Sequence, residues 1–295
     1  MINNYKIGIL GGTGFIGRNF IKLLKKKKIN YININRKSIK KKSILKNINY
    51  IFHFANQNNE VKASLNPIKD LKDNLFITID LLKKISEENN SIILIYISTA
   101  SLYKTSKKAV NENSNIKILS IYNLHKFFNE EYIKIFFEKH KIRFIILRTS
   151  NVYGFNSKNN RGYLLNLIKK IINNNKITFY NSGKQLRDYI YIDDYVNALY
   201  KITTKKNVTP GIFNLSYGKS YSYLDLFKKI KKILKIKFKK HSISNYNLIK
   251  NNNKLDNRFY VSNSHYFKKK FNWKPSYSIE NGIERIINKI LSKEL

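Results

Sequence analysis

The sequence predicts an α/β protein that begins with a doubly wound parallel sheet and continues with a smaller mixed domain. Segments that are almost continuously apolar alternate with segments whose apolar residues recur at helical spacing. Continuously apolar strands are typical of a parallel sheet that helices cover on both faces. Five of the chain's eleven glycines lie in GILGGTGFIG (8–17), between the first such strand and the first such helix. After residue 155 the alternation becomes irregular, which indicates the second domain.

The expected elements follow one another in a regular order. Strands are expected at 5–10, 31–35, 50–55, 92–98 and 143–148, and helices at 15–28, about 70–88, 122–140, 162–174, 222–234 and 279–293. A chain of 295 residues is long enough for one large or two modest domains. We therefore expect a first domain over 1–155, to which the chain returns at about 182–205. The second domain is expected over 156–181 and 206–295.

The formal net charge of +39 does not by itself indicate a nucleic-acid partner. Lysine outnumbers arginine by 49 to 8 and is spread over the whole chain, as AT-rich codon usage would produce. A nucleic-acid-binding module would gather its basic residues on one face, so we expect no specific nucleic-acid partner. The absence of cysteine excludes disulfides, thiolate metal sites and a cysteine nucleophile. The five histidines have no metal-ligand spacing, so no metal site is expected.

The hydropathy of the chain bears on its location. No apolar run reaches the length of a transmembrane helix. The first expected strand begins near residue 5, which leaves no room for a signal peptide. We therefore expect a soluble, cytoplasmic protein without a membrane span.

The glycine cluster has the spacing Gly11-x-x-Gly14-x-x-Gly17 and lies at a turn from a strand into a helix. At such a turn the pyrophosphate of a dinucleotide binds to the first amide groups of the helix. This position predicts a Rossmann-type, dinucleotide-binding first domain. The three glycines, with Phe15 and Ile16 between them, are candidate cofactor contacts.

The residue that would hold the adenosine ribose lies about 20 positions further on. Asn35 stands there instead of an acid, and Arg36 follows it. A guanidinium at this place favours the 2′-phosphate of NADP slightly, so the expected cofactor is NAD or NADP.

A second constellation is Tyr122-Asn123-Leu124-His125-Lys126, at the start of the helix that precedes the strand at 143. Residues four apart share a helix face, so the phenol and the ammonium point the same way. A free phenol has a pKa near ~10, and a neighbouring cation favours the phenolate. Tyr122 is therefore a candidate acid/base and Lys126 a candidate ribose ligand. Ser98 and Thr99, at the end of the apolar strand 92–98, are candidates to hydrogen-bond the reacting oxygen.

The ordered motifs resemble those of the extended short-chain dehydrogenase/reductases, and among them the NAD-dependent epimerase/dehydratase family typified by UDP-glucose 4-epimerase. The resemblance covers nearly the whole chain. It is carried by GGTGFIG (11–17), HFANQNN (53–59), KDNLFITIDLL (72–82), YNLHK (122–126), LRTSNVYGF (147–155), RDYIYIDD (187–194) and NWKPSYSIENGI (272–283). Several motifs in the family's order are far more specific than any one of them.

The resemblance implies a role for several residues. Thr99, Tyr122 and Lys126 would form the catalytic set, with Thr99 also touching substrate. Asn151 and Arg187 would contact the diphosphate of a nucleotide sugar, which an amide and a guanidinium suit chemically. Further cofactor contacts would come from Phe54, Ala55 and Asn74. The family also implies a homodimer formed through the long helix 122–140. Apolar residues that could supply its surface are Phe127, Phe128, Ile133, Phe136 and Phe137, although burial in the core explains them equally well.

Some positions depart from the family's pattern. Ala100 and Ser101 stand where dehydratases carry an Asp-Glu pair, so loss of water from the sugar is disfavoured. Asn123 replaces a glycine, and Asn253 stands where many relatives have an arginine. His53 is expected to be structural rather than catalytic.

The sequence predicts hydride chemistry on a nucleotide-linked sugar, with one leading function and two alternatives. The first is a nucleotide-sugar epimerase that oxidises a sugar hydroxyl transiently. The second is an NADPH-dependent 4-keto-sugar reductase, which would use the same residues. The third is a cofactor- or RNA-binding protein without catalysis.

Overall fold

The computed structural model describes residues 6–56, 59–106, 108–156, 162–205, 208–249 and 261–292. Its main sheet has six parallel strands in the order β2-β1-β3-β4-β5-β9. Along the chain these strands are β1 (Ile7–Leu10), β2 (Tyr31–Ile34), β3 (Tyr50–His53), β4 (Ile93–Thr99), β5 (Phe144–Thr149) and β9 (Gly211–Leu215). The strand order reverses between β1 and β3, which is where open α/β sheets bind ligands. The predicted doubly wound parallel sheet is confirmed.

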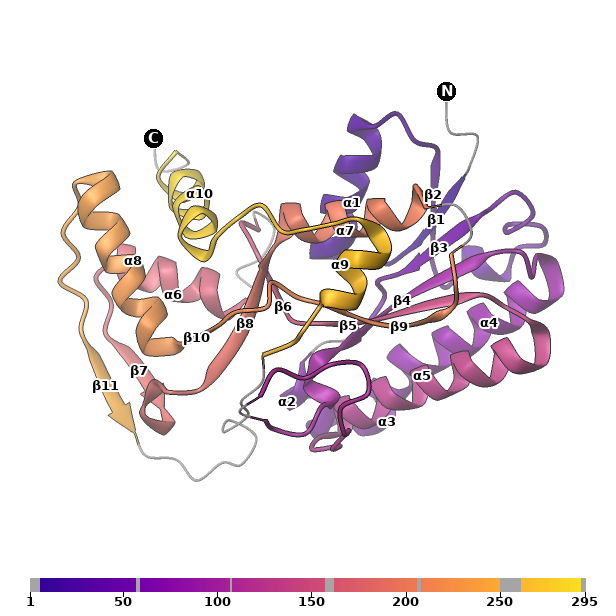
Figure 1. Ribbon diagram of the computed structural model, residues 1–295, viewed down its shortest axis with the longest axis horizontal. Coiled ribbons are helices and arrows are strands. Elements are labelled where there is room, and N and C mark those ends of the chain that lie inside the picture. Colours follow the sequence, from indigo (N-terminus) through magenta and orange to yellow (C-terminus); the bar gives the residue numbers. More distant parts are fainter. Residues whose placement is uncertain are drawn as a thin grey trace.

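Helices cover both faces of this sheet (Figure 1). The elements between and around its strands are α1 (Phe15–Lys26), η1 (Ser38–Lys40), α2 (Glu60–Leu65), α3 (Pro67–Leu71), η2 (Lys72–Phe76), α4 (Ile77–Glu88), η3 (Ala100–Leu102), α5 (Ile121–His140), α7 (Ile192–Thr203) and α9 (His265–Phe271). Alternate residues of β4 point to opposite faces, because side chains alternate along a strand. Ile95 belongs to a core with Phe20 of α1, whereas Tyr96 belongs to a second core with Leu81 of α4.

The second part of the chain forms a mixed lobe at the left of Figure 1. It contains the three-stranded sheet β10-β8-β6 and the two-stranded sheet β11-β7. The strands are β6 (Asn151–Tyr153), β7 (Ile177–Tyr180), β8 (Leu186–Tyr191), β10 (Ser220–Ser222) and β11 (Tyr246–Ile249); the helices are α6 (Tyr163–Ile172), η4 (Asn181–Gly183), α8 (Tyr223–Phe238) and α10 (Ile279–Leu291). A capping box between Ser222 and Asp225 starts α8, which satisfies two amide groups of its first turn. The expected smaller mixed part is thus present.

The path of the chain differs from the expected boundaries in one respect. β9 lies in the range 206–295 that the sequence assigned to the second domain, yet it pairs in parallel with β5 in the main sheet. α7 packs against α1, and α9 packs against β9. The chain therefore returns to the main sheet over a longer stretch than the expected 182–205.

The expected helix at 70–88 is divided. Pro67 begins α3, and the side chain of Asn66 accepts a hydrogen bond from the amide of Lys69. The turn η2 is a π-helix, a form that is frequent at functional sites. It places Asn74 in a buried position, where the Thr78 hydroxyl donates to the Asn74 carbonyl oxygen at 2.9 Å.

The part of the chain that the structure describes has neither a membrane-spanning helix nor a metal-binding cluster. None of the described helices is both long and apolar enough to cross a membrane. Within the same residues, no group of three or more histidine, aspartate and glutamate side chains is arranged to hold a metal ion.

Candidate active site

The turn from β1 into α1 requires glycine at two of its positions. Gly11 has φ +91°, and a Cβ there would lie 2.5 Å from the amide nitrogen of Ala55. A Cβ at Gly17 would collide with the carbonyl oxygen of Gly11. The loop and the segment after β3 therefore approach as closely as backbones allow, which brings Gly11 and Ala55 to the point where the strand order reverses.

Gly14 is different, because nothing in the chain itself demands a glycine there. Its φ is −71°, and a Cβ would meet only the Gly11 carbonyl oxygen, at an ordinary 3.4 Å. It is the N-cap of α1, yet no side chain caps this helix and no acid lies in its first turn. An open, uncapped helix start of this kind suits the pyrophosphate of a dinucleotide. The uncapped start of α1 therefore fits the predicted dinucleotide cofactor.

The other expected cofactor residues lie around the same edge. Phe15 and Ile16 begin α1, half-buried against the main core. The Phe54 ring packs on Phe20 and Phe52, so its side chain belongs to the core and its backbone is what faces the loop. Asn74 is buried in η2.

Asn35 and Arg36 directly follow the last residue of β2. The Asn35 side-chain oxygen accepts from the amides of Lys37 and Ser38, at 2.9 and 2.8 Å, so it shapes the loop. The Arg36 guanidinium donates to the Asp73 carboxylate at 2.7 Å. Although partial burial raises the pKa of Asp73, the hydrogen bond and charge of Arg36 lower that pKa overall. Arg36 therefore already has an anionic partner within the protein.

Lys126 lies in the interior, at the carboxyl end of β4. Its ammonium nitrogen donates to the Ile97 carbonyl oxygen at 2.6 Å and lies 4.9 Å from the centre of the Tyr96 ring. The distance from this nitrogen to the centre of the Tyr122 ring is 6.0 Å, which confirms that the two side chains share one face of α5. Burial lowers the pKa of Lys126 to about 7, while the charges of Glu130 and Asp70 oppose that shift.

Thr99 ends β4 and contacts the start of α5 through other side chains. Its hydroxyl lies 2.8 Å from the hydroxyl of Ser101 and accepts from the Ser101 amide at 3.1 Å. The Asn123 side chain donates to the Ser101 hydroxyl at 2.7 Å. Because Asn123 follows Tyr122 directly, these contacts tie Thr99 to the turn of α5 that carries Tyr122. The structure thus brings the three expected catalytic residues to one edge of the sheet.

A buried ion pair beneath this edge was not foreseen from the sequence. The Arg148 guanidinium of β5 donates from two nitrogens to the Glu130 carboxylate of α5, and Ser98 donates to the same carboxylate at 2.5 Å. Burial lowers the pKa of Arg148, but the hydrogen bonds and charge of Glu130 outweigh this and raise it. Glu130 lies one helical turn after Lys126 on α5, but that spacing alone does not indicate a buried carboxylate. The pair fixes α5 against β4 and β5.

A second buried polar contact supports α5 from the other side. The His125 Nδ1 atom lies 2.7 Å from a carboxylate oxygen of Asp70 in α3, and both side chains are buried. This contact joins the helix that carries Lys126 to the segment that leads into Asn74. Like the ion pair between Glu130 and Arg148, this contact joins residues far apart in the sequence, so no local sequence pattern predicts it.

The two expected diphosphate ligands lie in the neighbouring three-stranded sheet. Asn151 is exposed at the start of β6, and its side chain donates to the Asp188 carbonyl oxygen at 3.2 Å. It lies two residues after Thr149, which pairs with Thr99 in the main sheet. Arg187 lies on β8, the strand next to β6. Its guanidinium carbon is 5.9 Å from the centre of the Tyr223 ring. Both residues therefore lie beside the sheet edge that carries the catalytic candidates.

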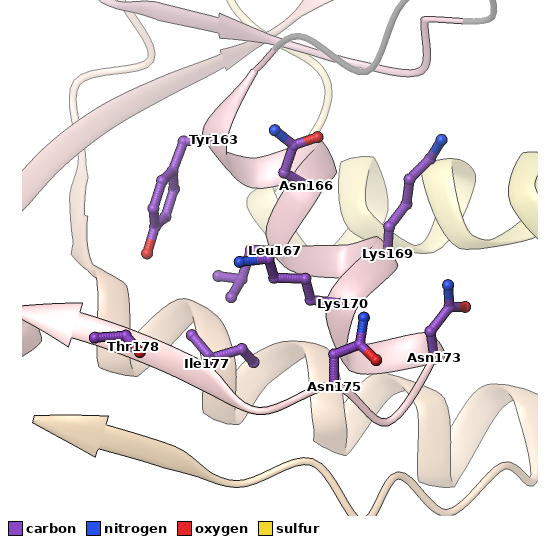
Figure 2. Close-up of a pocket in the computed structure, with 9 residues that line it drawn as sticks. All are labelled: Tyr163, Asn166, Leu167, Lys169, Lys170, Asn173, Asn175, Ile177 and Thr178. Atoms are coloured by element: carbon purple, nitrogen blue, oxygen red, sulfur yellow. The ribbon is translucent and has the colours of Figure 1, made fainter.

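A groove of about 420 Å³ extends along α6 and β7 (Figure 2). It is lined by Tyr163, Asn166, Leu167, Lys169, Lys170, Asn173, Asn175, Ile177 and Thr178. The Tyr163 ring at one end stacks on Tyr223 with ring centres 4.1 Å apart. Since Tyr223 also neighbours Arg187, these aromatic rings connect the groove to the expected diphosphate ligand.

Two further expectations have definite outcomes. His53 is fully buried, lies 3.0 Å from the Thr78 hydroxyl and has a pKa that burial and Lys126 lower to about 3, which suits a neutral structural role. Asn253, the departure from the family's arginine, lies outside the described residues.

The chain is similar to known proteins in its sequence and in its fold. The model of the NAD dependent epimerase/dehydratase family matches residues 7–216. A protein of Methanocaldococcus jannaschii named "Putative UDP-glucose 4-epimerase" is 30% identical over 293 residues, which cover 97% of this chain and 90% of that protein. The UDP-glucose 4-epimerase of Mycoplasma genitalium is 26% identical and covers 77% of this chain and 81% of its own length.

The fold has close counterparts among solved structures. The crystal structure of UDP-glucose 4-epimerase from Thermotoga maritima, with UDP-glucose, superposes with a TM-score of 0.82 at 22% identity and covers 98% of this chain and all of that one. That likeness concerns the fold, whereas the family model and the archaeal relative concern the sequence. The chain therefore belongs to the NAD dependent epimerase/dehydratase family and is an NAD(P)-dependent epimerase or oxidoreductase.

Proposed function

We propose that this protein is an NAD-dependent 4-epimerase of a nucleotide-diphosphate sugar. The observation that carries the proposal is the placement of Tyr122 and Lys126 on one face of α5, at the sheet edge where Thr99 ends β4. A phenol, a buried ammonium and a hydroxyl are the groups that reversible oxidation of a sugar hydroxyl requires. The relatives named as UDP-glucose 4-epimerases support this choice.

Each of the three residues has a separate task in this scheme. Tyr122 removes the proton of the hydroxyl at C4 and later returns it, and Thr99 donates a hydrogen bond to the same oxygen. The Lys126 cation favours the phenolate form of Tyr122. The nicotinamide, when bound, supplies the redox chemistry by taking and giving back a hydride. The configuration at C4 is inverted because the keto-sugar rotates within the site before it is reduced on its other face.

Loss of water from the sugar does not fit the site. That reaction requires an additional acid and base beside the reacting carbon. Ala100 and Ser101 offer no carboxylate, and Ser101 is engaged with Thr99 and Asn123. We therefore favour epimerisation over dehydration.

The ion pair between Arg36 and Asp73 favours NAD over NADP. A 2′-phosphate placed beside Arg36 would also meet the Asp73 carboxylate, which lies 2.7 Å from the guanidinium. Like charges at such a distance disfavour binding. The ribose hydroxyls of NAD raise no such conflict. The ion pair also weighs against the NADPH-dependent reductase.

The second lobe is proposed to hold the nucleotide sugar, and the main sheet the dinucleotide. Arg187 and Asn151 suit the diphosphate, because guanidinium and amide groups donate to its oxygens. The groove that begins at Tyr163 is proposed to take the nucleoside, since aromatic rings stack on bases. Cytoplasmic location stays a prediction from the sequence.

A homodimer formed through α5 is also proposed. Phe128, Tyr132 and Ile135 are 39%, 38% and 46% exposed and recur at positions four and three apart, which makes one stripe along the helix. Of the five apolar residues singled out from the sequence only Phe128 belongs to this stripe, because Ile133 is buried and the other three are half-buried. A second copy of α5 would cover this surface.

The decisive experiment compares the purified wild type with Tyr122→Phe on UDP-glucose and UDP-N-acetylglucosamine. First, mass spectrometry of the nucleotide released on denaturation identifies the bound cofactor, and NAD is expected. Wild type should then interconvert a sugar and its 4-epimer without net cofactor consumption, and the variant should be slower by about 10²-fold or more with unchanged NAD binding. NADPH consumed in proportion to product would instead show the reductase. Failure to bind any nicotinamide nucleotide would refute the enzyme assignment at this site.

A further inference from the structure

Four polar side chains form a continuous hydrogen-bonded chain from the first turn of α5 to Thr99. The Ser120 hydroxyl donates to the Asn123 side-chain oxygen at 3.0 Å and accepts from the Asn123 amide at 3.2 Å. The Asn123 side-chain nitrogen donates to the Ser101 hydroxyl at 2.7 Å, which lies 2.8 Å from the Thr99 hydroxyl. Ser101 and Asn123 are buried, whereas Thr99 is partly open to solvent.

The hydrogen bonds in this chain point in one direction. A hydroxyl group has one proton to donate and can accept twice. Ser101 is buried and accepts from the Asn123 side chain, and its hydroxyl has one further contact among the described side chains, the Thr99 hydroxyl at 2.8 Å. Because a buried proton needs an acceptor, we infer that the Ser101 proton goes to the Thr99 oxygen. That oxygen also accepts from the Ser101 amide at 3.1 Å. Both lone pairs of Thr99 are then occupied from inside the protein, and its proton is directed away from the chain.

The orientation of the Asn123 amide supports this direction. The Ser120 hydroxyl accepts the backbone amide of Asn123 as the N-cap of α5, so it has a proton to give and requires an acceptor. The Asn123 oxygen is that acceptor, which leaves the nitrogen facing Ser101. A reversed amide would turn two donors of Asn123 toward the Ser120 oxygen, and the Ser120 proton would lose its acceptor on Asn123.

We propose that Ser101 and Asn123 are positioning residues that hold Thr99 as an obligatory hydrogen-bond donor to the reacting oxygen of the substrate. This inference rests on the proposed function. A carbonyl oxygen can only accept hydrogen bonds, so a fixed donor stabilises the keto-sugar and the charge that develops on its oxygen in each direction of the reaction. Ser101 stands where dehydratases carry an acid, and Asn123 stands where the family carries a glycine. In this chain the two side chains contact each other.

A double-mutant cycle tests the inference through activity. Thr99→Val should lower kcat by about 10²-fold. Asn123→Ala should lower kcat by about tenfold with KM nearly unchanged, because Ser101 then has no donor to set its direction. In the Thr99→Val background, Asn123→Ala should have no further effect, since the residue acts only through Thr99. The proposal would be overturned if the losses of kcat in the two single variants multiplied in the double variant. It would also be overturned if Asn123→Ala left kcat unchanged.

Two controls separate positioning from stability. Asn129→Ala removes another buried asparagine of α5, which donates to the His125 carbonyl oxygen rather than toward Thr99. Asn129→Ala should lower Tm, and its effect on kcat should be the same in the wild type and in the Thr99→Val background. If Asn123→Ala does not fold, Ser101→Ala takes its place in the cycle, and its kcat loss should likewise vanish in the Thr99→Val background.

A readout independent of activity tests the direction of the chain itself. Neutron diffraction from deuterated crystals should place the Ser101 deuteron toward Thr99 and the Asn123 nitrogen toward Ser101. A Thr99 deuteron that points at Ser101 would contradict the inference even in an active epimerase. A wild type that shows the expected deuterons but converts no sugar would confirm the direction and refute the proposed function instead.

Discussion

The ammonium nitrogen of Lys126 lies 2.6 Å from the carbonyl oxygen of Ile97, inside the protein and beneath the edge where β4 ends. A lysine in such a place has lost most of its hydration, which is why burial lowers its pKa to about 7. The chain keeps a costly buried cation here, and the phenol of Tyr122 is its neighbour on the same helix face.

Lys126→Met should lower kcat by about 10²-fold or more, because Tyr122 loses the cation that favours its phenolate. Turnover of the nucleotide sugar measures the effect. Lys134→Met is the matched control, since Lys134 lies on the same helix but pairs with Glu131 near the surface. An active Lys126→Met variant would show that the phenolate does not depend on this lysine.

Replacing two glycines of one loop by alanine should give opposite results. Gly14→Ala should leave Tm almost unchanged and weaken NAD binding by about tenfold or more, because its Cβ has room in the protein but occupies the open start of α1. Gly17→Ala should destabilise the fold, because its Cβ would collide with backbone. Thermal unfolding and fluorescence titration with NAD measure both. NAD binding as tight in Gly14→Ala as in the wild type would place the pyrophosphate elsewhere.

Asp73→Asn should shift the cofactor preference toward NADP. The substitution removes the carboxylate that pairs with Arg36 and leaves the guanidinium available to a 2′-phosphate. We expect the ratio of the NAD and NADP dissociation constants to move by about tenfold, or ~1.4 kcal/mol. Asp80→Asn, an exposed position of α4, should leave the ratio unchanged. A wild type that already prefers NADP would contradict the selectivity argument.

His53 should make the wild type less stable in acid. Its pKa of about 3 in the folded protein lies below the ordinary histidine value of 6.5, so the unfolded chain binds the extra proton first. The contribution of His53 to the free energy of unfolding is fully present above pH 6.5. It is lost as the pH falls toward 3, by up to ~1.4 kcal/mol per pH unit. His53→Gln should lack this contribution, measured by denaturant unfolding at pH 7, 6 and 5. His241→Gln, at an exposed position, should follow the wild type; an equal pH slope in His53→Gln would show that His53 is not buried neutral.

Tyr132→Lys should convert a dimer into a monomer, because it places a charge in the centre of the exposed apolar stripe on α5. Light scattering after size exclusion gives the mass directly. Ile236→Lys alters another exposed apolar residue, 62% accessible and located on α8, and should not change the mass. A wild type that is monomeric at all concentrations would refute the dimer.

The elements that the sequence could predict are those with local patterns. Continuous apolar runs gave the strands around Tyr96 and Leu147, and residue spacing on one helix gave Tyr122 with Lys126. The buried Glu130 could not be found this way, because a charged residue on an amphipathic helix normally faces solvent. Its burial depends on Arg148, which arrives 18 residues later on a strand.

The same distinction explains the misplaced boundary. The segment at 211–215 is a short apolar run that could belong to either lobe, and only its pairing with β5 decides the question. Strand pairing between distant segments produces no periodic pattern in the sequence of either strand. The same holds for the Ser101 to Asn123 contact, whose members each looked like an isolated exception to a family pattern.

The placement of β9 also governs how the chain can be made and divided. Newly synthesised protein must wait until residue 215 has emerged before the last strand of the main sheet can be added. Until then β5 presents an unpaired apolar edge of the kind that invites association with other chains. A fragment that stops at residue 205 would keep that edge permanently, so the two lobes are inseparable by any single cut in the chain.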